Sequence, residues 1–121
     1  MADRVVDASA LAALLFAEAE AASIAAAIRG MRLIAPAILG FELANVCLMK
    51  CRHFPDRRED FLASYAAVQS LGVQELPVDH DAVLALAAAT RLTHYDAAYL
   101  WLSRRTGAAL VSLDRALLAA I

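Results

Sequence analysis

The feature of this sequence that most constrains its fold is a regular alternation of short apolar runs with helix-forming segments. Runs typical of β-strands lie at 4–7, 31–35, 73–78 and 109–113. Two helical segments separate each run from the next, and one more follows the last run. A strand can reach a parallel neighbour only through a long crossover, which is usually helical. We therefore expect an α/β fold with a parallel or mostly parallel sheet covered by helices.

The helical segments are placed by their apolar spacing and by glycine and proline. Helices are expected at 9–17, 20–29, 37–51, 56–70, 79–91 and 93–106, with a short helix after Asp114. Gly30, Gly72 and Gly107 are expected to end the segments that precede them. Pro36 is expected near the first turn of the 37–51 helix, where its missing N–H is harmless. The predicted order is β-α-α-β-α-α-β-α-α-β-α.

Bulk composition indicates one folded domain over residues 1–121. Hydrophobic residues make up 62% of the 121 residues, with 4 glycines and 3 prolines, which argues against disorder. The formal net charge of −2 gives the whole protein no electrostatic attraction to nucleic acid, although a local basic patch remains compatible with it. No uncharged apolar run approaches the ~20 residues that cross a bilayer, and the first residues lack a signal-peptide pattern. We expect a cytoplasmic protein without membrane association.

The two cysteines, Cys47 and Cys51, lie one helical turn apart. Side chains at this spacing are too far apart for an unstrained disulfide. A thiolate metal site that includes His53 is an alternative, but structural zinc normally takes four ligands. Free thiols in a reducing compartment are the interpretation that we favour.

Acidic residues follow the first and the last predicted strands. Asp7 ends the 4–7 run and Asp114 follows the 109–113 run. Ligands of parallel sheets bind at the carboxyl ends of the strands, so these two acids are expected at one edge. Aspartate is also a good N-cap, and each of the two precedes a helix. Both interpretations stay open for each residue taken singly.

Two further acids lie within helical segments. Thr93 and Asp96 have the spacing of a capping box, while Tyr99 and Leu100 on the same face indicate that Asp96 is partly buried. Glu42 is expected about six residues inside the 37–51 helix, beside its apolar stripe and without a basic residue at helical pairing distance. A solvated position beside the stripe is the alternative for Glu42.

Four carboxylates brought together would repel one another and raise some of their pKa values. A bound divalent cation relieves this repulsion. Mg²⁺ and Mn²⁺ prefer oxygen ligands, and Mg²⁺ retains waters that can serve as nucleophiles. Ser9, Asn45 and Ser112 lie two or three residues from three of the acids and are expected to hydrogen-bond around such a site.

In the stretches that hold these acids, the sequence resembles PIN-domain ribonucleases, and among them the VapC-type toxins of bacterial toxin–antitoxin pairs. The matching stretches are VVDASAL (5–11), IAPAILGFELANV (34–46) and LTHYDAAYLWLSRRTGAALVSLDRAL (92–117). The resemblance implies a three-layer α/β/α fold around a short, mostly parallel sheet of four to five strands. It also implies a metal-dependent endoribonuclease that uses Mg²⁺ or Mn²⁺, works as a homodimer and is inhibited by a small antitoxin protein. Carried over by position, the acidic quartet is Asp7, Glu42, Asp96 and Asp114, with Ser9, Asn45 and Ser112 supporting it.

The candidate contacts to RNA phosphates are arginines. They form two groups: Arg52, Arg57 and Arg58 around the turn between the third and fourth helices, and Arg104, Arg105 and Arg115 near the C-terminus. Ordinary surface charges are the alternative for each of them.

Other functions remain to be weighed against hydrolysis of RNA. A phosphoaspartate enzyme or a response-regulator receiver fits poorly, because Asp7 lacks a second acid two residues later and the only lysine lies on a helix. A non-catalytic RNA-binding or protein-docking module that kept the fold is the alternative from another class. Retention of all four acids favours the enzyme.

Overall fold

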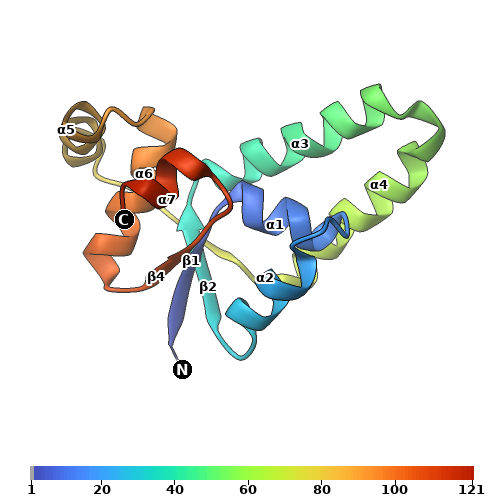
Figure 1. The fold of residues 1–121 in the computed structure, drawn as a ribbon, viewed down its shortest axis with the longest axis horizontal. Coiled ribbons are helices and arrows are strands. Elements are labelled where there is room, and N and C mark those ends of the chain that lie inside the picture. The colour runs from blue at the N-terminus through green and yellow to red at the C-terminus, as the bar shows by residue number, and fades with distance from the viewer. Residues whose placement is uncertain (1) are drawn as a thin grey trace.

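The computed structural model describes residues 2–121, and the order of its elements follows the prediction (Figure 1). The strands are β1 (Asp3–Val6), β2 (Arg32–Pro36), β3 (Gln74–Leu76) and β4 (Ala109–Val111). The α-helices are α1 (Ala8–Leu15), α2 (Ala21–Ile28), α3 (Leu39–His53), α4 (Arg58–Ala66), α5 (His80–Thr90), α6 (His94–Thr106) and α7 (Arg115–Ala119). Short 3-10 turns, η1 (Pro55–Arg57) and η2 (Ala67–Leu71), flank α4.

Within residues 2–121, all strand pairs of the sheet are parallel, in the order β3-β2-β1-β4. Val5 of β1 pairs with Ile34 of β2 on one side and with Leu110 of β4 on the other. The chain therefore moves outward from β1 through β2 to β3 and then returns to the far side of β1. Loops diverge where the order of a parallel sheet reverses in this way, and ligands bind there. The switch point lies between the carboxyl ends of β1 and β4.

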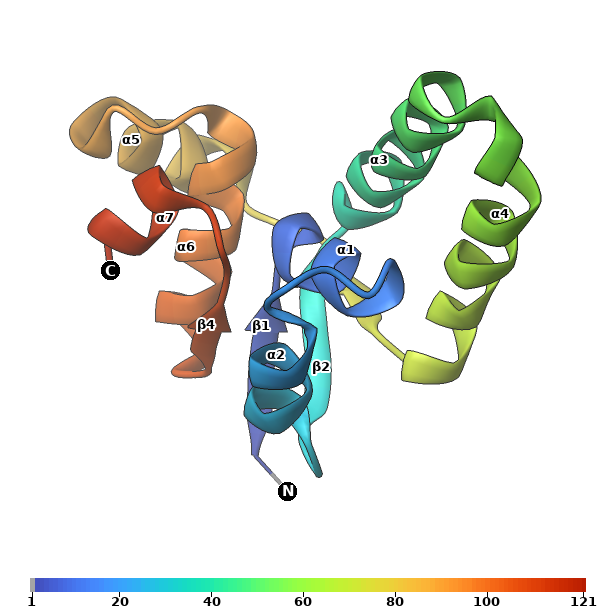
Figure 2. The ribbon, with the colours of Figure 1, turned by 45° about the vertical axis from the view of Figure 1, so that its right-hand side comes forward.

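Helices cover both faces of the sheet, as the predicted three-layer α/β/α architecture requires. Figures 1 and 2 show α1 and α2 on one face and α6 on the other, with α5 packed against α6. The antiparallel pair α3 and α4 forms an arm that extends away from the sheet. Leu11, Leu43 and Tyr99 are among the largest fully buried side chains of the core. None of the helices in residues 2–121 combines the length and the apolar character needed to cross a bilayer.

Two boundaries differ from the prediction at the end of β2. Pro36 is the last residue of β2, not part of the next helix, and α3 begins only at Leu39. By the register of β1 and β2, the missing N–H of Pro36 would face the carboxyl end of β1, so its absence costs at most the last bond of that ladder. On the other side, Ala37 N–H donates to the carbonyl of Leu76 at 3.1 Å and extends the pairing with β3. The extra strand residues shift the start of α3 toward Glu42.

The segment expected as a single helix at 56–70 is interrupted. Pro55 starts the 3-10 turn η1, α4 occupies only Arg58–Ala66, and the chain tightens again into η2. Gly72 ends this segment in the left-handed conformation at φ +62°, which glycine adopts without the penalty of a Cβ. The predicted strand at 73–78 shrinks to the three residues of β3.

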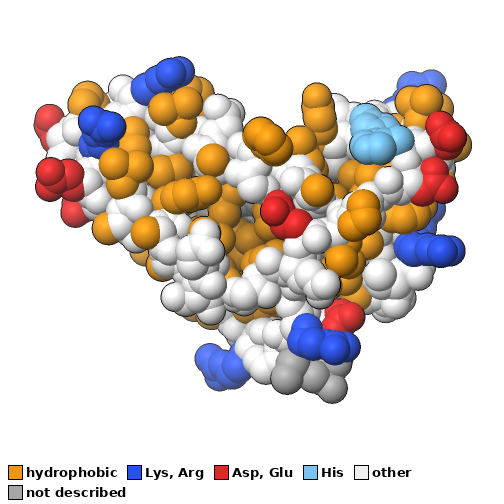
Figure 3. All heavy atoms as spheres, turned by 180° about the vertical axis from the view of Figure 1, so that it is seen from behind, with side chains coloured by type: hydrophobic (Ala, Val, Ile, Leu, Met, Phe, Trp, Pro, Cys, Tyr) orange, Lys and Arg blue, Asp and Glu red, His pale blue; other side chains and the backbone are white. Residues whose placement is uncertain are grey.

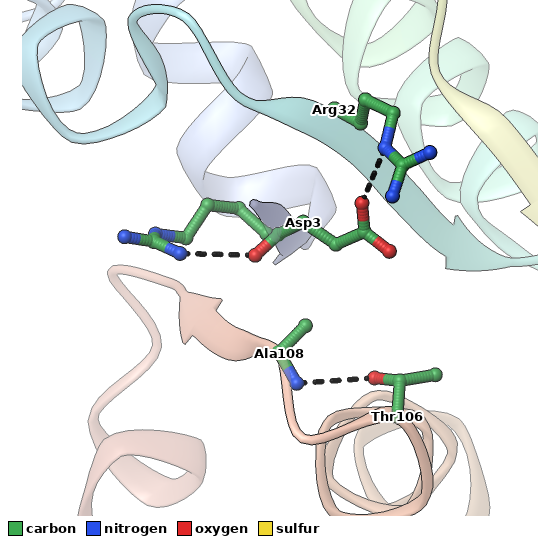
Figure 4. A network of polar contacts seen from close by, with 5 residues as sticks. Asp3, Arg32, Thr106 and Ala108 are labelled. Atoms are coloured by element: carbon green, nitrogen blue, oxygen red, sulfur yellow. Dashed lines mark hydrogen bonds and ion pairs between the residues drawn. The ribbon is translucent and has the colours of Figure 1, made fainter. Parts of the chain in front are cut away.

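Polar contacts at the amino edge of the sheet show that the last turn of α6 lies there (Figure 4). There, Arg32 Nε donates to Asp3 Oδ1 at 2.7 Å, which ties the starts of β1 and β2. At the same edge Ala108 N–H donates to Thr106 Oγ1 at 3.2 Å, in the turn from α6 into β4. Because α6 ends at the amino edge, its first turn lies at the carboxyl edge.

Candidate active site

Each of the four predicted acids lies at the start of a helix at the carboxyl edge of the sheet. Asp7 caps α1 and accepts a hydrogen bond from Ala10 N–H at 3.0 Å. Asp114 caps α7 and accepts from Leu117 N–H at 2.9 Å. Asp96 and Glu42 lie in the first turns of α6 and α3. The capping interpretation is therefore correct for Asp7 and Asp114, and a single carboxylate can cap a helix and still face a site.

The position of Glu42 corrects the sequence prediction. It was expected about six residues inside its helix, but α3 begins at Leu39, so Glu42 lies in the first turn. The positive end of the α3 dipole favours a carboxylate there, typically by about 0.3–1 kcal/mol. Glu42 is half-buried beside the apolar stripe, as predicted.

The four carboxylates are close enough to perturb one another. Burial raises the pKa of Glu42, and the charges of Asp96, Asp7 and Asp114 raise it further, although a hydrogen bond from Tyr99 opposes this change. Burial also raises the pKa of Asp96, together with the charges of Asp114 and Asp7, while a hydrogen bond with Thr93 opposes the change. Only 4% of the surface of Asp7 is exposed. The structure thus concentrates negative charge at the switch point.

No basic side chain compensates this charge within residues 2–121. The ion pairs there are Arg32 with Asp3 and Lys50 with Glu18, both outside the acidic quartet. The converging helix starts supply partial positive charge, but each contributes little compared with a bound cation. The negative charge of the four acids is therefore not offset by a basic side chain of residues 2–121.

Two serines attach Asp7 to both loops of the switch point. Ser9 Oγ donates to Asp7 Oδ1 at 2.7 Å, and Ser112 Oγ donates to Asp7 Oδ2. Backbone N–H groups continue this network, because Leu113 donates to Ser9 Oγ at 2.9 Å and Asp114 to Ser112 Oγ at 3.0 Å. The network fixes the β1–α1 loop against the β4–α7 loop.

Asn45 behaves differently from the two serines. It lies one turn after Glu42 on α3 and is exposed, and its side chain makes no hydrogen bond within residues 2–121. Its supporting role stays a prediction, and solvent can hydrogen-bond to its exposed side chain.

Tyr99 is a site residue that sequence analysis missed. Its hydroxyl donates to Glu42 Oε1 at 2.7 Å, and the side chain is only 1% exposed. Burial and the neighbouring Glu42 raise the pKa of Tyr99 strongly, so it remains a protonated donor. The signal in the sequence was its place three residues after Asp96, on the same helical face.

The donor set has the chemistry that a hard divalent ion requires. Glu42 and Asp114 each use one carboxylate oxygen in the hydrogen bonds described above, and the second oxygen remains open to solvent. Oxygen ligands with uncompensated charge suit Mg²⁺ or Mn²⁺. In residues 2–121, however, no three acidic, histidine or cysteine side chains converge closely enough to form a complete metal site.

The fold and this acidic edge agree with a known family, since the chain matches the family model described as PIN domain over residues 4–120. This chain belongs to the PIN-domain family. PIN domains are typically divalent-metal-dependent nucleases, which assigns this one at a coarse level to hydrolases acting on nucleic acid.

A solved structure supports the same assignment. The crystal structure of PAE2754 from Pyrobaculum aerophilum superimposes on this PIN domain with a TM-score of 0.79 and 30% sequence identity. The match covers 98% of this chain and 79% of that one. No curated protein sequence matches the chain.

The predicted RNA-contacting arginines lie at very different distances from the acidic edge of this PIN domain. Arg115 is exposed and directly follows Asp114. Arg104 and Arg105 lie in the last turn of α6, about 12 Å along the helix from Asp96 at 1.5 Å per residue. Arg52, Arg57 and Arg58 lie at the tip of the α3–α4 arm, where the Arg57 guanidinium covers the Phe61 ring at 4.8 Å. The geometry favours Arg115 among the six.

The cysteines are free thiols, as predicted. Cys47 is buried and Cys51 is half-buried, and neither forms a disulfide in the described chain. Burial raises the pKa of the Cys47 thiol, so it is protonated and unreactive at neutral pH. The alternative metal site with His53 finds no support, because no group of three such ligands occurs within residues 2–121.

Proposed function

We propose that this PIN domain is a Mg²⁺- or Mn²⁺-dependent endoribonuclease that hydrolyses RNA phosphodiester bonds. The observation that carries the proposal is the concentration of four carboxylates at the switch point without a basic partner. A merely structural arrangement of acids would not need all four at one edge, since two of them suffice as helix caps. Burial and mutual repulsion make the arrangement unfavourable without a cation.

The residues have separate roles in this proposal. Asp7, Glu42, Asp96 and Asp114 would hold the ion. Ser9 and Ser112 orient both oxygens of Asp7, and Tyr99 orients Glu42 through Oε1. When bound, a divalent ion supplies activation of a water for in-line attack on phosphorus and stabilises the leaving oxygen. The exposed Arg115 beside Asp114 is placed to contact a phosphate of the strand.

The biological part of the proposal follows from the resemblance to VapC-type toxins. We propose that the domain acts in the cytoplasm as the toxin of a toxin–antitoxin pair, as a homodimer, and that a small antitoxin protein covers the four acids. Co-purification of the chain with the product of a short neighbouring reading frame, with loss of RNA cleavage in that complex, would support this role.

One observation favours a second candidate, a PIN-like module that binds RNA or protein without cleaving it. In residues 2–121 the acids interact electrostatically but do not converge as a finished metal site. Repulsion between uncompensated carboxylates agrees with such an open arrangement. The same openness would also be found in a domain that has lost metal binding.

The experiment that tests the proposal is a cleavage assay with Mg²⁺, Mn²⁺ or EDTA on mixed RNA substrates. We expect metal-dependent cleavage that EDTA abolishes and that Asp96→Asn reduces by at least about 100-fold, since this variant removes a metal ligand but keeps the side-chain shape. Cleavage that persists in EDTA or in the variant would contradict the mechanism. Absence of cleavage by well-folded wild type in either metal would favour the non-catalytic module.

A further inference from the structure

A pocket lies at the carboxyl edge of the sheet, beside the first turn of α6. Its volume is about 380 Å³, and the residues that line it include the aromatic His80, His94 and Tyr95 and the apolar Pro36, Ile38 and Val78. We call it the ring pocket. Its volume lies within the range of sites that bind small organic groups. On the face seen in Figure 3, histidine side chains are bordered by hydrophobic ones over the end of the molecule formed by α5 and α6.

The ring pocket and the acidic site lie on opposite sides of one helical turn. His94 and Ala98, which both line the pocket, are four residues apart and share a face of α6. Asp96 lies between them in sequence and therefore on the other face, where it interacts with Asp7 and Asp114. A strand that crosses the start of α6 would thus reach both sites.

The imidazole rings of His80 and His94 contact each other. His80 Nδ1 and His94 Nε2 are 3.0 Å apart, within hydrogen-bond distance, and the ring planes are inclined by only 18°. This bond joins the starts of α5 and α6 and has a structural role by itself. It does not explain why Tyr95, the third ring, is 58% exposed at the pocket with no hydrogen bond within residues 2–121.

The residues that line the ring pocket indicate which kind of ligand it can bind. No Lys, Arg, Asp or Glu side chain among the described residues lines the ring pocket, so a phosphate finds no charged partner there. Apolar walls with aromatic rings suit a flat, neutral, aromatic group. Bases of single-stranded RNA are such groups, and proteins commonly bind them by stacking on tyrosine or histidine rings.

We propose that the ring pocket receives one unpaired nucleobase of the RNA strand whose phosphodiester lies at the acidic quartet. This inference rests on the proposed ribonuclease function and adds a base-binding subsite to it. Tyr95 directly precedes Asp96, so a base in the pocket belongs to a nucleotide near the bond that is cut. The subsite would make cleavage depend on which bases can be unstacked and held there.

The test measures binding of short single-stranded RNAs that carry 2-aminopurine, whose fluorescence falls when it stacks. All proteins carry Asp7→Asn, which is expected to prevent cleavage. Against this background, Tyr95→Ala should weaken binding by about 5- to 140-fold, the effect of losing one base–aromatic stack. Tyr95→Phe keeps the ring and should restore binding to within about 2-fold of the background. Leu84→Ala, at a 61% exposed position of α5 outside the pocket, is the matched control and should change nothing.

An abasic nucleotide placed at each position in turn locates the base. One position should weaken binding to the background protein but not further weaken binding to Tyr95→Ala. If Tyr95→Ala binds every RNA as tightly as the background and no position couples to it, the base subsite is refuted even if wild type cleaves RNA. If wild type neither binds nor cleaves RNA, the proposed function fails and the subsite fails with it. Equal melting temperatures of the variants exclude loss of the fold as the cause.

Discussion

Tyr99→Phe tests whether the hydrogen bond to Glu42 holds the acidic site together. The substitution removes a single oxygen from a side chain that is 1% exposed, and this oxygen donates to Glu42 Oε1 at 2.7 Å. A hydrogen bond to a charged group contributes about 1.5–3 kcal/mol. Glu42 is half-buried, so water can partly replace the lost donor. We therefore expect the free energy of unfolding to fall by about 1–2 kcal/mol, at the low end of that range.

The assay is urea and thermal unfolding in EDTA, so that bound metal does not contribute. For a domain of this size the expected loss lowers the melting temperature by about 4–8 °C. A double-mutant cycle with Glu42→Ala isolates the contact. Without Glu42 the buried Tyr99 hydroxyl has lost its partner. In the Glu42→Ala background, Tyr99→Phe should therefore leave the free energy of unfolding unchanged or raise it.

Two results would refute this reasoning. The first is a cost below about 0.3 kcal/mol for Tyr99→Phe in the wild-type background, within the error of independent effects. The second is an equal cost with and without Glu42, which would show that the hydroxyl acts through packing. Either result would remove Tyr99 from the site.

Three further predictions address charge, metal and RNA. In EDTA at pH 8, Glu42→Gln should unfold at higher urea than wild type, and this gap should close as the pH falls through the raised pKa of Glu42, which lies above the ordinary value of 4.5. A carboxyl whose pKa is raised in the folded state stabilises the fold at low pH, and this stabilisation is lost as the pH rises. A difference in stability between the two proteins that widens in acid would contradict the prediction. Mn²⁺ should raise the melting temperature of wild type but not of Asp7→Asn, and equal, unmoved values for both proteins would argue against the metal site. Arg115→Gln should weaken RNA binding and reduce the slope of log affinity against log salt concentration by about 1. Arg104→Gln, at the far end of α6, should leave both the affinity and the slope unchanged. If filter binding at several salt concentrations shows the larger effect for Arg104→Gln, the RNA follows another path.

The element order could be predicted because it depends on local signals, and the same signals pointed to the four acids as candidate site residues. Apolar runs with helical connections predicted the parallel sheet, and the four acids were identified by their places after strands or within apolar helices. Boundaries were less accurate where neighbouring strands decide them. Pro36 joined β2 because it pairs with Leu76 of β3, and this moved the start of α3 next to Glu42.

Contacts between distant segments could not be predicted in the same way. Tyr99 and Glu42 are 57 residues apart, and Ser112 and Asp7 are 105 residues apart, so no sequence spacing relates them. The residues of the ring pocket are likewise distant in the sequence, because they come from the end of β2, the segment after β3 and the first turns of α5 and α6.

By itself, the sequence determined the fold class, the family resemblance and the set of acids, because hydrophobic periodicity and short motifs are properties of neighbouring residues. Only the tertiary structure decided that Glu42, like the other three acids, lies at a helix start, that no basic residue in the described chain pairs with the four acids, and that Tyr99 donates a hydrogen bond to Glu42. The physical reason is the crossover that returns β4 to the far side of β1. That crossover brings Asp114 beside Asp7, and packing of α6 and α3 against the same edge brings Asp96 and Glu42 to them.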